Sequence, residues 1–341
     1  MASAFYSDRH TFEKSLMKLA VTIDVEEEGL FLGKYDSGDV PVSNVPELGK
    51  LDPLFRQWGI RPTMLVTYPV IRHEPHQDLL LRLREKWSAE IGAHLHHWNT
   101  PPLESLPFPQ PVPSELIPER LLQAKMESLL EAFKPMGIAP ASFRMGRFNM
   151  GPKMFSVLQR TEIRVDSSIA PTQSYYGGPD HRYAPWDPYF PDPSDLCGPG
   201  TSRILEAPIT IVPLAPRLGL FLDRLRKKPA VPEKWVSRIP LHLGALPAQP
   251  MWMGLRRLQA AVLLHRKRGG EVLTMFFHSS ELMPGGCPQH RTAGDVERFL
   301  NKLSRFFSWL YTEVSPESLT LSQLGDIYHR NDASSYPFSH S

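Results

Sequence analysis

Short apolar segments of the kind that form β-strands alternate with amphipathic helical segments along nearly the whole chain of 341 residues. We predict strands at residues 16–25, 62–68, 89–95, 142–145, 163–167, 203–212 and 271–278. Helices are predicted between and after them at residues 45–58, 77–87, 114–133, 154–160, 251–266 and 293–311. Because helical crossovers join parallel strands, this alternation predicts an α/β fold, either an open sheet or a barrel.

The length allows one large domain or two ordinary ones, but the sequence contains no internal repeat and no evident linker. We therefore predict a single catalytic domain over residues 1–341, with its core at about 16–328. Two proline-rich segments, at about 98–114 and 169–203, are predicted to be long ordered loops, which tend to be functional in compact domains. The C-terminal tail, 330–341, is predicted to be frayed.

The composition excludes several classes of protein. A net charge of +2 gives no overall field that would favour nucleic acid or an anionic membrane surface. No apolar run reaches the roughly 18 residues of a membrane span, and the first ten residues lack the apolar core of a signal peptide. The two cysteines do not make a disulfide framework. These features favour a cytoplasmic location, and they do not indicate an oligomeric state.

Three histidines stand at the end of the predicted strand 89–95, in the tetrapeptide His94-Leu95-His96-His97. Alternate residues of a strand point to the same side, so His94 and His96 can offer two nitrogens to one ion. Histidine is the commonest metal-ligating side chain. An exposed polar loop that happens to contain histidines is the alternative interpretation.

Acidic residues stand at the end of the first predicted strand, in Asp24-Val25-Glu26. The carboxyl ends of parallel strands share one rim of an α/β fold, where active sites form. One carboxylate could bind a metal together with two histidines, which is the pattern of a hydrolytic metal site, while the other stays free as a base. Helix capping or rim solubility is the alternative for Glu26, and this alternative carries more weight for Glu27 and Glu28 than for Glu26.

Three further polar residues end predicted strands. His278 follows an apolar run and is suited to general acid catalysis, with Asp166 as the expected carboxylate partner that sets its pKa. Arg144 could pair with Asp24 and keep it ionised. For His278, the alternative is a core histidine whose hydrogen bonds are satisfied there. For Arg144, the alternative is an ordinary surface arginine.

This ordered set of strand ends resembles the polysaccharide deacetylases of the NodB-homology type, carbohydrate esterase family 4, whose five motifs lie on a distorted (β/α) barrel. Four matches are Thr-Ile-Asp-Val-Glu at 22–26, Ser-Phe-Arg-Met-Gly-Arg at 142–147, Asp-Ser-Ser at 166–168 and Phe-Phe-His at 276–278. The resemblance spans about residues 19–324. It implies that Asp24 is the catalytic base, that Arg144 positions it, and that His278 is the general acid. Asp166 falls on the fourth motif, and Glu26 matches the carboxylate ligand of the metal.

The second motif departs from the family pattern, which places its two histidine ligands four residues apart. Four residues after His94 stands Trp98, which cannot bind a metal. The second histidine ligand is then His96 or His97, and the alternation of strand side chains favours His96. The sequence resembles a cytoplasmic branch of the family more than the secreted deacetylases.

The resemblance implies a metal-dependent hydrolase of carbon–nitrogen bonds that removes an N-acetyl group from an amino sugar or polysaccharide, with zinc as the expected divalent ion. Trp98, Tyr175 and Trp186 in the two proline-rich loops could stack on sugar rings, with loop packing as the alternative for each. Two other functions stay open. One is hydrolysis of another amide or imide bond in a small molecule, which some relatives perform without a metal, and the other is glycan binding without catalysis.

Overall fold

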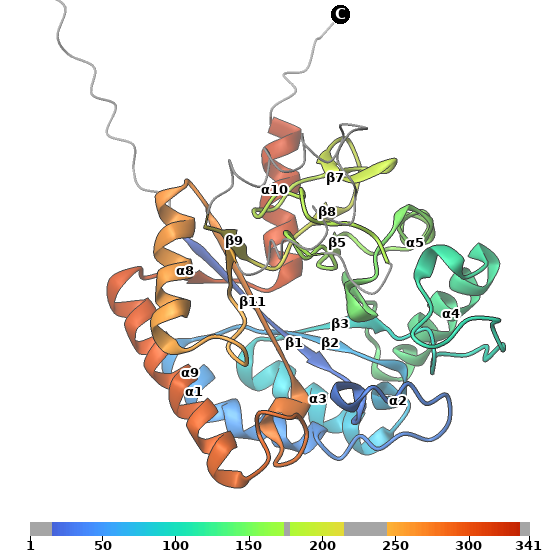
Figure 1. Cartoon of the computed structure of the whole chain (residues 1–341), viewed down its shortest axis with the longest axis horizontal. Coiled ribbons are helices and arrows are strands. Elements are labelled where there is room, and N and C mark those ends of the chain that lie inside the picture. Colours follow the sequence, from blue (N-terminus) through green and yellow to red (C-terminus); the bar gives the residue numbers. More distant parts are fainter. Residues whose placement is uncertain (1–15, 174–177, 215–243, 335–341) are drawn as a thin grey trace, which may run out of the picture.

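The computed structural model describes residues 16–173, 178–214 and 244–334 (Figure 1). Its centre is a parallel sheet with the strand order β11-β1-β2-β3-β4-β5-β8, to which β12 adds beside β1. These strands are β1 (Lys18–Val25), β2 (Thr63–Val66), β3 (Glu90–Leu95), β4 (Ser142–Met145), β5 (Val165–Asp166), β8 (Leu205–Glu206), β11 (Val272–His278) and β12 (Glu317–Ser318). The sheet curls into a half-barrel, which confirms the predicted distorted (β/α) barrel.

Helices surround this sheet (Figure 1). They are α1 (Asp52–Trp58), α2 (Tyr68–Ile71), α3 (Glu74–Trp87), α4 (Glu119–Ala132), α5 (Pro152–Leu158), α8 (Leu255–Lys267), α9 (Ala293–Glu313) and α10 (Leu321–Ser334). Two short antiparallel pairs lie outside the main sheet: β6 (Pro191–Asp192) with β7 (Asp195–Pro199), and β9 (Ile211–Pro213) with β10 (Ala245–Pro247). Within the described ranges, each helix is too short or too polar to cross a lipid bilayer.

Thr210, four residues after β8, joins that segment of the chain to β11 at the other end of the sheet. The backbone N–H of Thr210 donates to the carbonyl of Thr274 on β11 at 3.0 Å. In return, the N–H of Thr274 donates to the hydroxyl oxygen of Thr210 at 2.9 Å. A side-chain hydroxyl thus takes the place of a backbone acceptor beside β11, and the two end strands, β8 and β11, are not paired with each other.

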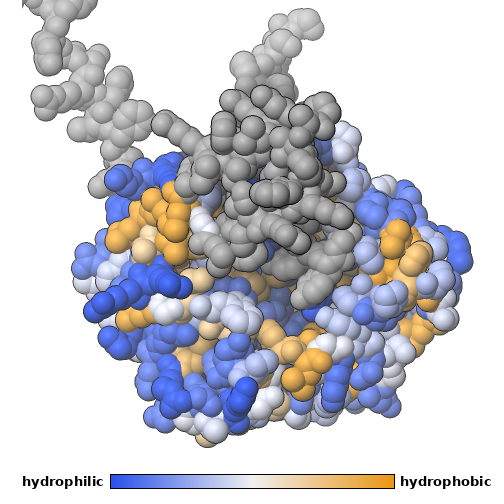
Figure 2. Space-filling model, viewed as in Figure 1, coloured by the Kyte–Doolittle hydropathy of each residue, from blue (hydrophilic) through white to orange (hydrophobic). Residues whose placement is uncertain are grey.

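The core explains why these segments fold as they do. Both faces of β1 are buried, as expected of a parallel strand covered on both sides. Helix α9 buries one apolar stripe, at Val296, Phe299, Leu303, Phe306, Phe307 and Leu310. On the face shown in Figure 2, hydrophilic residues predominate and hydrophobic ones form separate patches. The apolar residues therefore serve mainly to pack helices against the sheet that carries the polar rim.

The structure differs from the predicted elements in several places. The predicted strand 203–212 is divided into two short strands, β8 and β9, and the first half of the predicted helix 45–58 is a 3₁₀ helix. The elements α2, β6, β7, β10 and β12 were not predicted.

The predicted helix 114–133 is interrupted, because Pro118 favours an extended backbone at Ile117, whose ψ is 134°. A short 3₁₀ turn, Ser114–Leu116, precedes the break, and α4 begins after Pro118. At the other end of the chain, α10 was not predicted, and it continues through residue 330 to Ser334. The rest of the predicted frayed tail, 335–341, lies outside the described residues, and the single domain stays a prediction.

Candidate active site

The carboxyl ends of the strands bring the predicted polar residues together at one rim of the sheet. The register of β1 and β11 pairs Asp24 with His278, and the register of β3 and β4 pairs His94 with Arg144. Asp24, His94 and Arg144 are buried, while the side chain of His278 keeps 14% of its surface exposed. The rim therefore forms a largely enclosed polar site with one imidazole facing its mouth.

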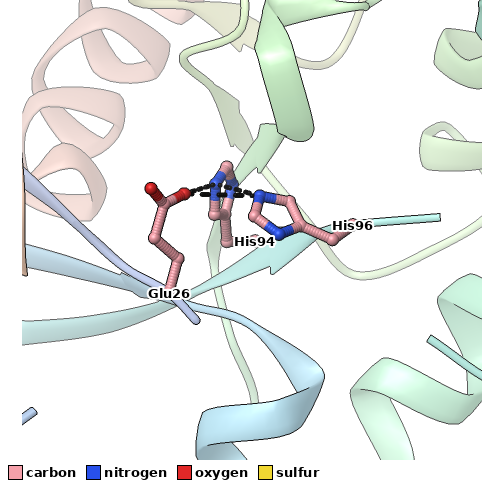
Figure 3. A group of neighbouring side chains, drawn as sticks. All are labelled: Glu26, His94 and His96. Carbon is pink, nitrogen blue, oxygen red and sulfur yellow. Dashed lines mark hydrogen bonds and ion pairs between the residues drawn. The ribbon is translucent and has the colours of Figure 1, made fainter. Parts of the chain in front are cut away.

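Glu26, His94 and His96 point toward one another (Figure 3). The Nε2 atoms of the two histidines lie 3.0 Å apart, and Oε2 of Glu26 lies 3.5 Å from His94 and 3.4 Å from His96. The ring of His97 turns elsewhere, with its Nε2 3.1 Å from the Oε1 atom of Gln110. The cluster therefore contains His96, as the strand alternation favoured, and not His97.

The hydrogen-bond partners of the two Nδ1 atoms show which nitrogen of each ring carries the hydrogen. Nδ1 of His94 is 2.9 Å from the carbonyl oxygen of Arg144, and Nδ1 of His96 is 2.8 Å from Oε1 of Glu27. Both partners accept hydrogen bonds, so each neutral ring carries its hydrogen on Nδ1 and a lone pair on Nε2. Two lone pairs and a carboxylate oxygen at these distances can hold one cation between them. Two imidazoles and one carboxylate are ligands suited to zinc and similar divalent ions.

Glu27 holds His96 in place. Its Oε1 accepts hydrogen bonds from Nδ1 of His96, from the indole N–H of Trp98 at 3.0 Å and from Nδ2 of Asn99 at 2.6 Å. Burial raises the pKa of Glu27, but His96 and these hydrogen bonds outweigh it and lower the pKa to about 2. Such a carboxylate fixes the orientation of a ligating histidine and raises its basicity. The alternative of capping or rim solubility is therefore wrong for Glu27.

Trp98 supports the same histidine from another side. Its side chain is buried, and its ring stacks on that of His96 with centroids 4.3 Å apart and an interplanar angle of 29°. One face of the indole is therefore covered by His96 and the side chain as a whole is buried, so the prediction that Trp98 stacks on a sugar is wrong. Tyr175, also predicted to bind substrate, lies outside the described residues.

Trp186 lies at the opposite end of the barrel from the site. The neighbouring carboxylate of Asp187 accepts a hydrogen bond at 3.0 Å from the backbone N–H of Val272, the first residue of β11. His278 ends the same strand, and six residues of strand span roughly 20 Å. The prediction that Trp186 binds the substrate is therefore wrong, because its loop folds back to the amino end of the sheet.

Arg144 binds the predicted base in the interior of the site. Its Nη1 lies 2.5 Å from Oδ1 of Asp24, its Nη2 donates to the hydroxyls of Thr22 and Ser167 at 2.9 and 2.8 Å, and its Nε donates to the Ser167 carbonyl at 2.7 Å. Burial raises the pKa of Asp24, but Arg144, His94 and His278 together hold that pKa below its ordinary value. Asp24 is therefore ionised at neutral pH and held in one orientation.

His278 faces the carboxylates of the site. Its Nε2 lies 3.9 Å from both Oδ2 of Asp24 and Oε1 of Glu26. Its Nδ1 lies 2.8 Å from Oε1 of Glu281, which also accepts the backbone N–H of His278 at 3.1 Å. Burial lowers the pKa of His278, but the carboxylates of Glu26, Glu281 and Asp24 outweigh it and raise the pKa to about 9. The expected partner Asp166 is wrong, since Glu281 takes that place.

Asp166 has a different partner. It stands beside Glu206 in the register of β5 and β8, and both side chains are fully buried. Burial raises the pKa of Asp166 to about 6 and that of Glu206 well above its usual range, so Glu206 keeps a proton and the two share a hydrogen bond. Asp166 also accepts the hydroxyl of Ser168, whose oxygen accepts the backbone N–H of Met145 at 2.8 Å. Asp166 is therefore linked through Ser168 to the end of β4, beside Arg144, and is not the partner of His278.

No protein-family model matches this sequence, and no curated protein sequence matches it. Solved structures do match. A protein from Mycobacterium smegmatis, provisionally assigned as a polysaccharide deacetylase, aligns with a TM-score of 0.55 and 15% identity over 97% of this chain and 96% of its own. A protein from Parabacteroides distasonis, provisionally assigned as a glycoside hydrolase/deacetylase, aligns with a TM-score of 0.60 and 13% identity over 93% of this chain and 73% of its own. The chain has the polysaccharide deacetylase fold.

Within this deacetylase fold, Glu27 and Glu281 are two residues next to the proposed catalytic groups that the sequence interpretation missed. Glu27 belongs to a run of three glutamates directly after a buried strand, where one carboxylate can bind a ligand and the next can support it. Glu281 follows His278 by three residues and forms a capping box with it. The spacing of that box was the signal that could have identified the partner of His278.

Proposed function

We propose that this protein is a metal-dependent hydrolase that removes an N-acetyl group from an amino sugar or polysaccharide. The observation that carries the proposal is the convergence of two unprotonated Nε2 atoms, of His94 and His96, on one oxygen of Glu26. A charged base and a charged acid, Asp24 and His278, stand beside this cluster. Zinc is the proposed ion because two imidazoles and a carboxylate are characteristic of catalytic zinc sites.

When bound, the metal would lower the pKa of water and polarise the acyl carbonyl. Glu26, His94 and His96 would hold the ion. Asp24, ionised and oriented by Arg144, accepts the proton of the attacking water. His278 carries a proton at neutral pH and donates it to the leaving amine.

The two atoms that would move protons lie close enough to act on one bond, because Nε2 of His278 is 3.9 Å from Oδ2 of Asp24. The names of both structural neighbours refer to carbohydrate chemistry, which supports a carbohydrate substrate for this chain. The cytoplasmic location stays a prediction.

The test is release of acetate from N-acetylated oligosaccharides by the purified protein, with and without a chelator. We expect activity that the chelator abolishes and zinc restores. Asp24→Asn should lower kcat/KM by roughly 10²–10⁴-fold, the usual range for a general base. Asp78→Asn, a matched change on the exposed face of α3, should leave activity unchanged.

Full activity of Asp24→Asn would contradict the proposed mechanism. Activity in metal-free protein on a cyclic amide or imide, with none on acetylated sugars, would favour the alternative hydrolase. Glycan binding without turnover by the zinc-loaded wild type would favour the non-catalytic alternative.

A further inference from the structure

The outward side of α8 combines exposed apolar side chains with positive charge. The residues that α8 buries are Leu258, Ala261, Val262 and His265. Residues three or four apart lie on one side of a helix, and the set exposed on the opposite side is Arg256, Ala260, Leu263 and Lys267. We call these four residues the outer face of α8. The packing of the barrel uses none of them, so the face is open to a partner.

Further large apolar side chains are exposed at both ends of α8. Trp252, three residues before the helix begins, keeps 54% of its surface exposed, and Leu263 in the helix keeps 52%. Leu214 is 50% exposed and lies at the other end, where Nη2 of Arg268 donates to its carbonyl oxygen at 3.1 Å. In Figure 2, hydrophobic residues lie beside strongly hydrophilic ones at the position of α8. A partner that covered these side chains would remove apolar surface from water, which favours binding there.

The charge along this segment has one sign. Residues 244–270 include five lysines and arginines and no aspartate or glutamate. Within the part of the chain that the structure describes, no carboxylate forms an ion pair with Arg256, Arg257 or Lys267. The whole chain has a net charge of only +2, so the excess at α8 is local. It favours a partner whose surface is negatively charged.

We infer that the outer face of α8, together with Trp252 and Leu214, binds the surface of an anionic lipid bilayer. Tryptophan is enriched where the hydrocarbon of a membrane meets water, and exposed leucines can enter the same layer. Lysines and arginines near an anionic leaflet are attracted to its headgroups. A nucleic acid would attract the same cations but would leave Leu214 and Leu263 without apolar contact. The inference does not rest on the proposed function, because binding to vesicles is measured without turnover.

The test is co-sedimentation of the full chain with vesicles of phosphatidylcholine alone and of equal parts phosphatidylcholine and phosphatidylglycerol. We expect the partition coefficient to be at least tenfold higher for the anionic vesicles and to fall as sodium chloride is added. Arg256→Gln combined with Lys267→Gln should lower it roughly 10–30-fold, because each cation near an anionic surface contributes to binding. Trp252→Ser combined with Leu263→Ser should lower it roughly tenfold through the loss of apolar burial.

The matched controls change exposed residues on other elements. Arg82→Gln combined with Arg84→Gln on α3 removes the same charge, and Leu116→Ser removes an exposed leucine, so both should bind anionic vesicles as the wild type does. Equal binding to both kinds of vesicle, binding to neither, or anionic binding that survives the substitutions on α8 would overturn the inference.

Two other occupants of the face would give distinct results. Binding of double-stranded DNA without binding of vesicles would assign the positive charge to a nucleic acid. Self-association in sedimentation velocity that Trp252→Ser abolishes, again without vesicle binding, would assign the face to a second copy of the chain. Either result would overturn the inference of a bilayer, whereas acetate release by the wild type tests the proposed function separately.

Discussion

Nε2 of His94 and Nε2 of His96 lie 3.0 Å apart, and neither bears a hydrogen when the rings are neutral, because both Nδ1 atoms donate elsewhere. Substitution of either histidine should therefore remove zinc, whereas His97→Ala should not. We expect close to one zinc per chain in the wild type and in His97→Ala, and little in His96→Ala, measured by elemental analysis after dialysis. The loss of affinity should exceed the roughly 10–100-fold that follows from changes to residues supporting a ligand.

His97→Ala is a close control because it removes a neighbouring imidazole whose Nε2 faces Gln110. Equal zinc contents in His96→Ala and His97→Ala would contradict the proposed ligand set. Circular dichroism of both variants would show whether a loss of zinc reflects a loss of fold.

Glu27→Gln tests the support of His96. The carboxylate of Glu27 accepts three hydrogen bonds, and glutamine keeps the size of the side chain while losing the charge. We expect zinc affinity to fall roughly 10–100-fold, with a parallel loss of activity that excess zinc partly restores. Glu28→Gln is the matched control, because Glu28 bonds to Ser43 instead. The same zinc affinity in both variants would show that Glu27 does not support the site.

The sequence predicts the fold and the rim well, because both depend on local patterns. The alternation of strands and helices determines a parallel sheet, and the carboxyl ends of parallel strands must share one rim. Asp24, Glu26, His94 and Arg144 could therefore be placed together from their positions at strand ends alone. His96 could be preferred over His97 from the side-chain alternation of a strand.

The loops and the supporting carboxylates could not be predicted in the same way. Trp98 and Trp186 both stand in proline-rich loops rich in aromatic residues, but the path of each loop depends on distant contacts. Asp187 bonds to the start of β11, which draws Trp186 to the far end of the barrel. Asp166 is not the partner of His278, because the two-residue strand β8 places Glu206 beside Asp166. The sequence alone does not show this pairing.

Glu281→Gln should impair the proposed general acid. The carboxylate of Glu281 contributes to the raised pKa of His278 and fixes its ring through Nδ1. We expect a lower kcat/KM, within the roughly 10²–10⁴-fold that general acid catalysis provides, and an alkaline limb of the pH profile that moves to lower pH. Glu281→Asp should recover part of the loss. A lower rate with an unchanged alkaline limb would assign Glu281 a purely structural role.

The last prediction concerns stability and the buried pair of Asp166 and Glu206. Their pKa values are raised in the folded protein, to about 6 for Asp166 and higher for Glu206. The folded state therefore binds more protons than the unfolded chain above about pH 4, so the stability that the pair contributes is present at low pH and is lost as the pH rises through 6 and beyond. Glu206→Gln imitates the protonated form and should remove this loss. It can keep the hydrogen bond from the backbone N–H of Ile169 to Oε1.

We expect the free energy of unfolding of Glu206→Gln, relative to the wild type, to rise between pH 5 and pH 8 by on the order of 1–3 kcal/mol. Urea denaturation at both pH values measures this difference. Glu85→Gln, an exposed change on α3, should follow the wild type at both pH values. A difference between Glu206→Gln and the wild type that is the same at pH 5 and pH 8 would mean that both carboxyls ionise normally despite their burial. The pair would then need a cation or water beside it to stabilise two negative charges between β5 and β8.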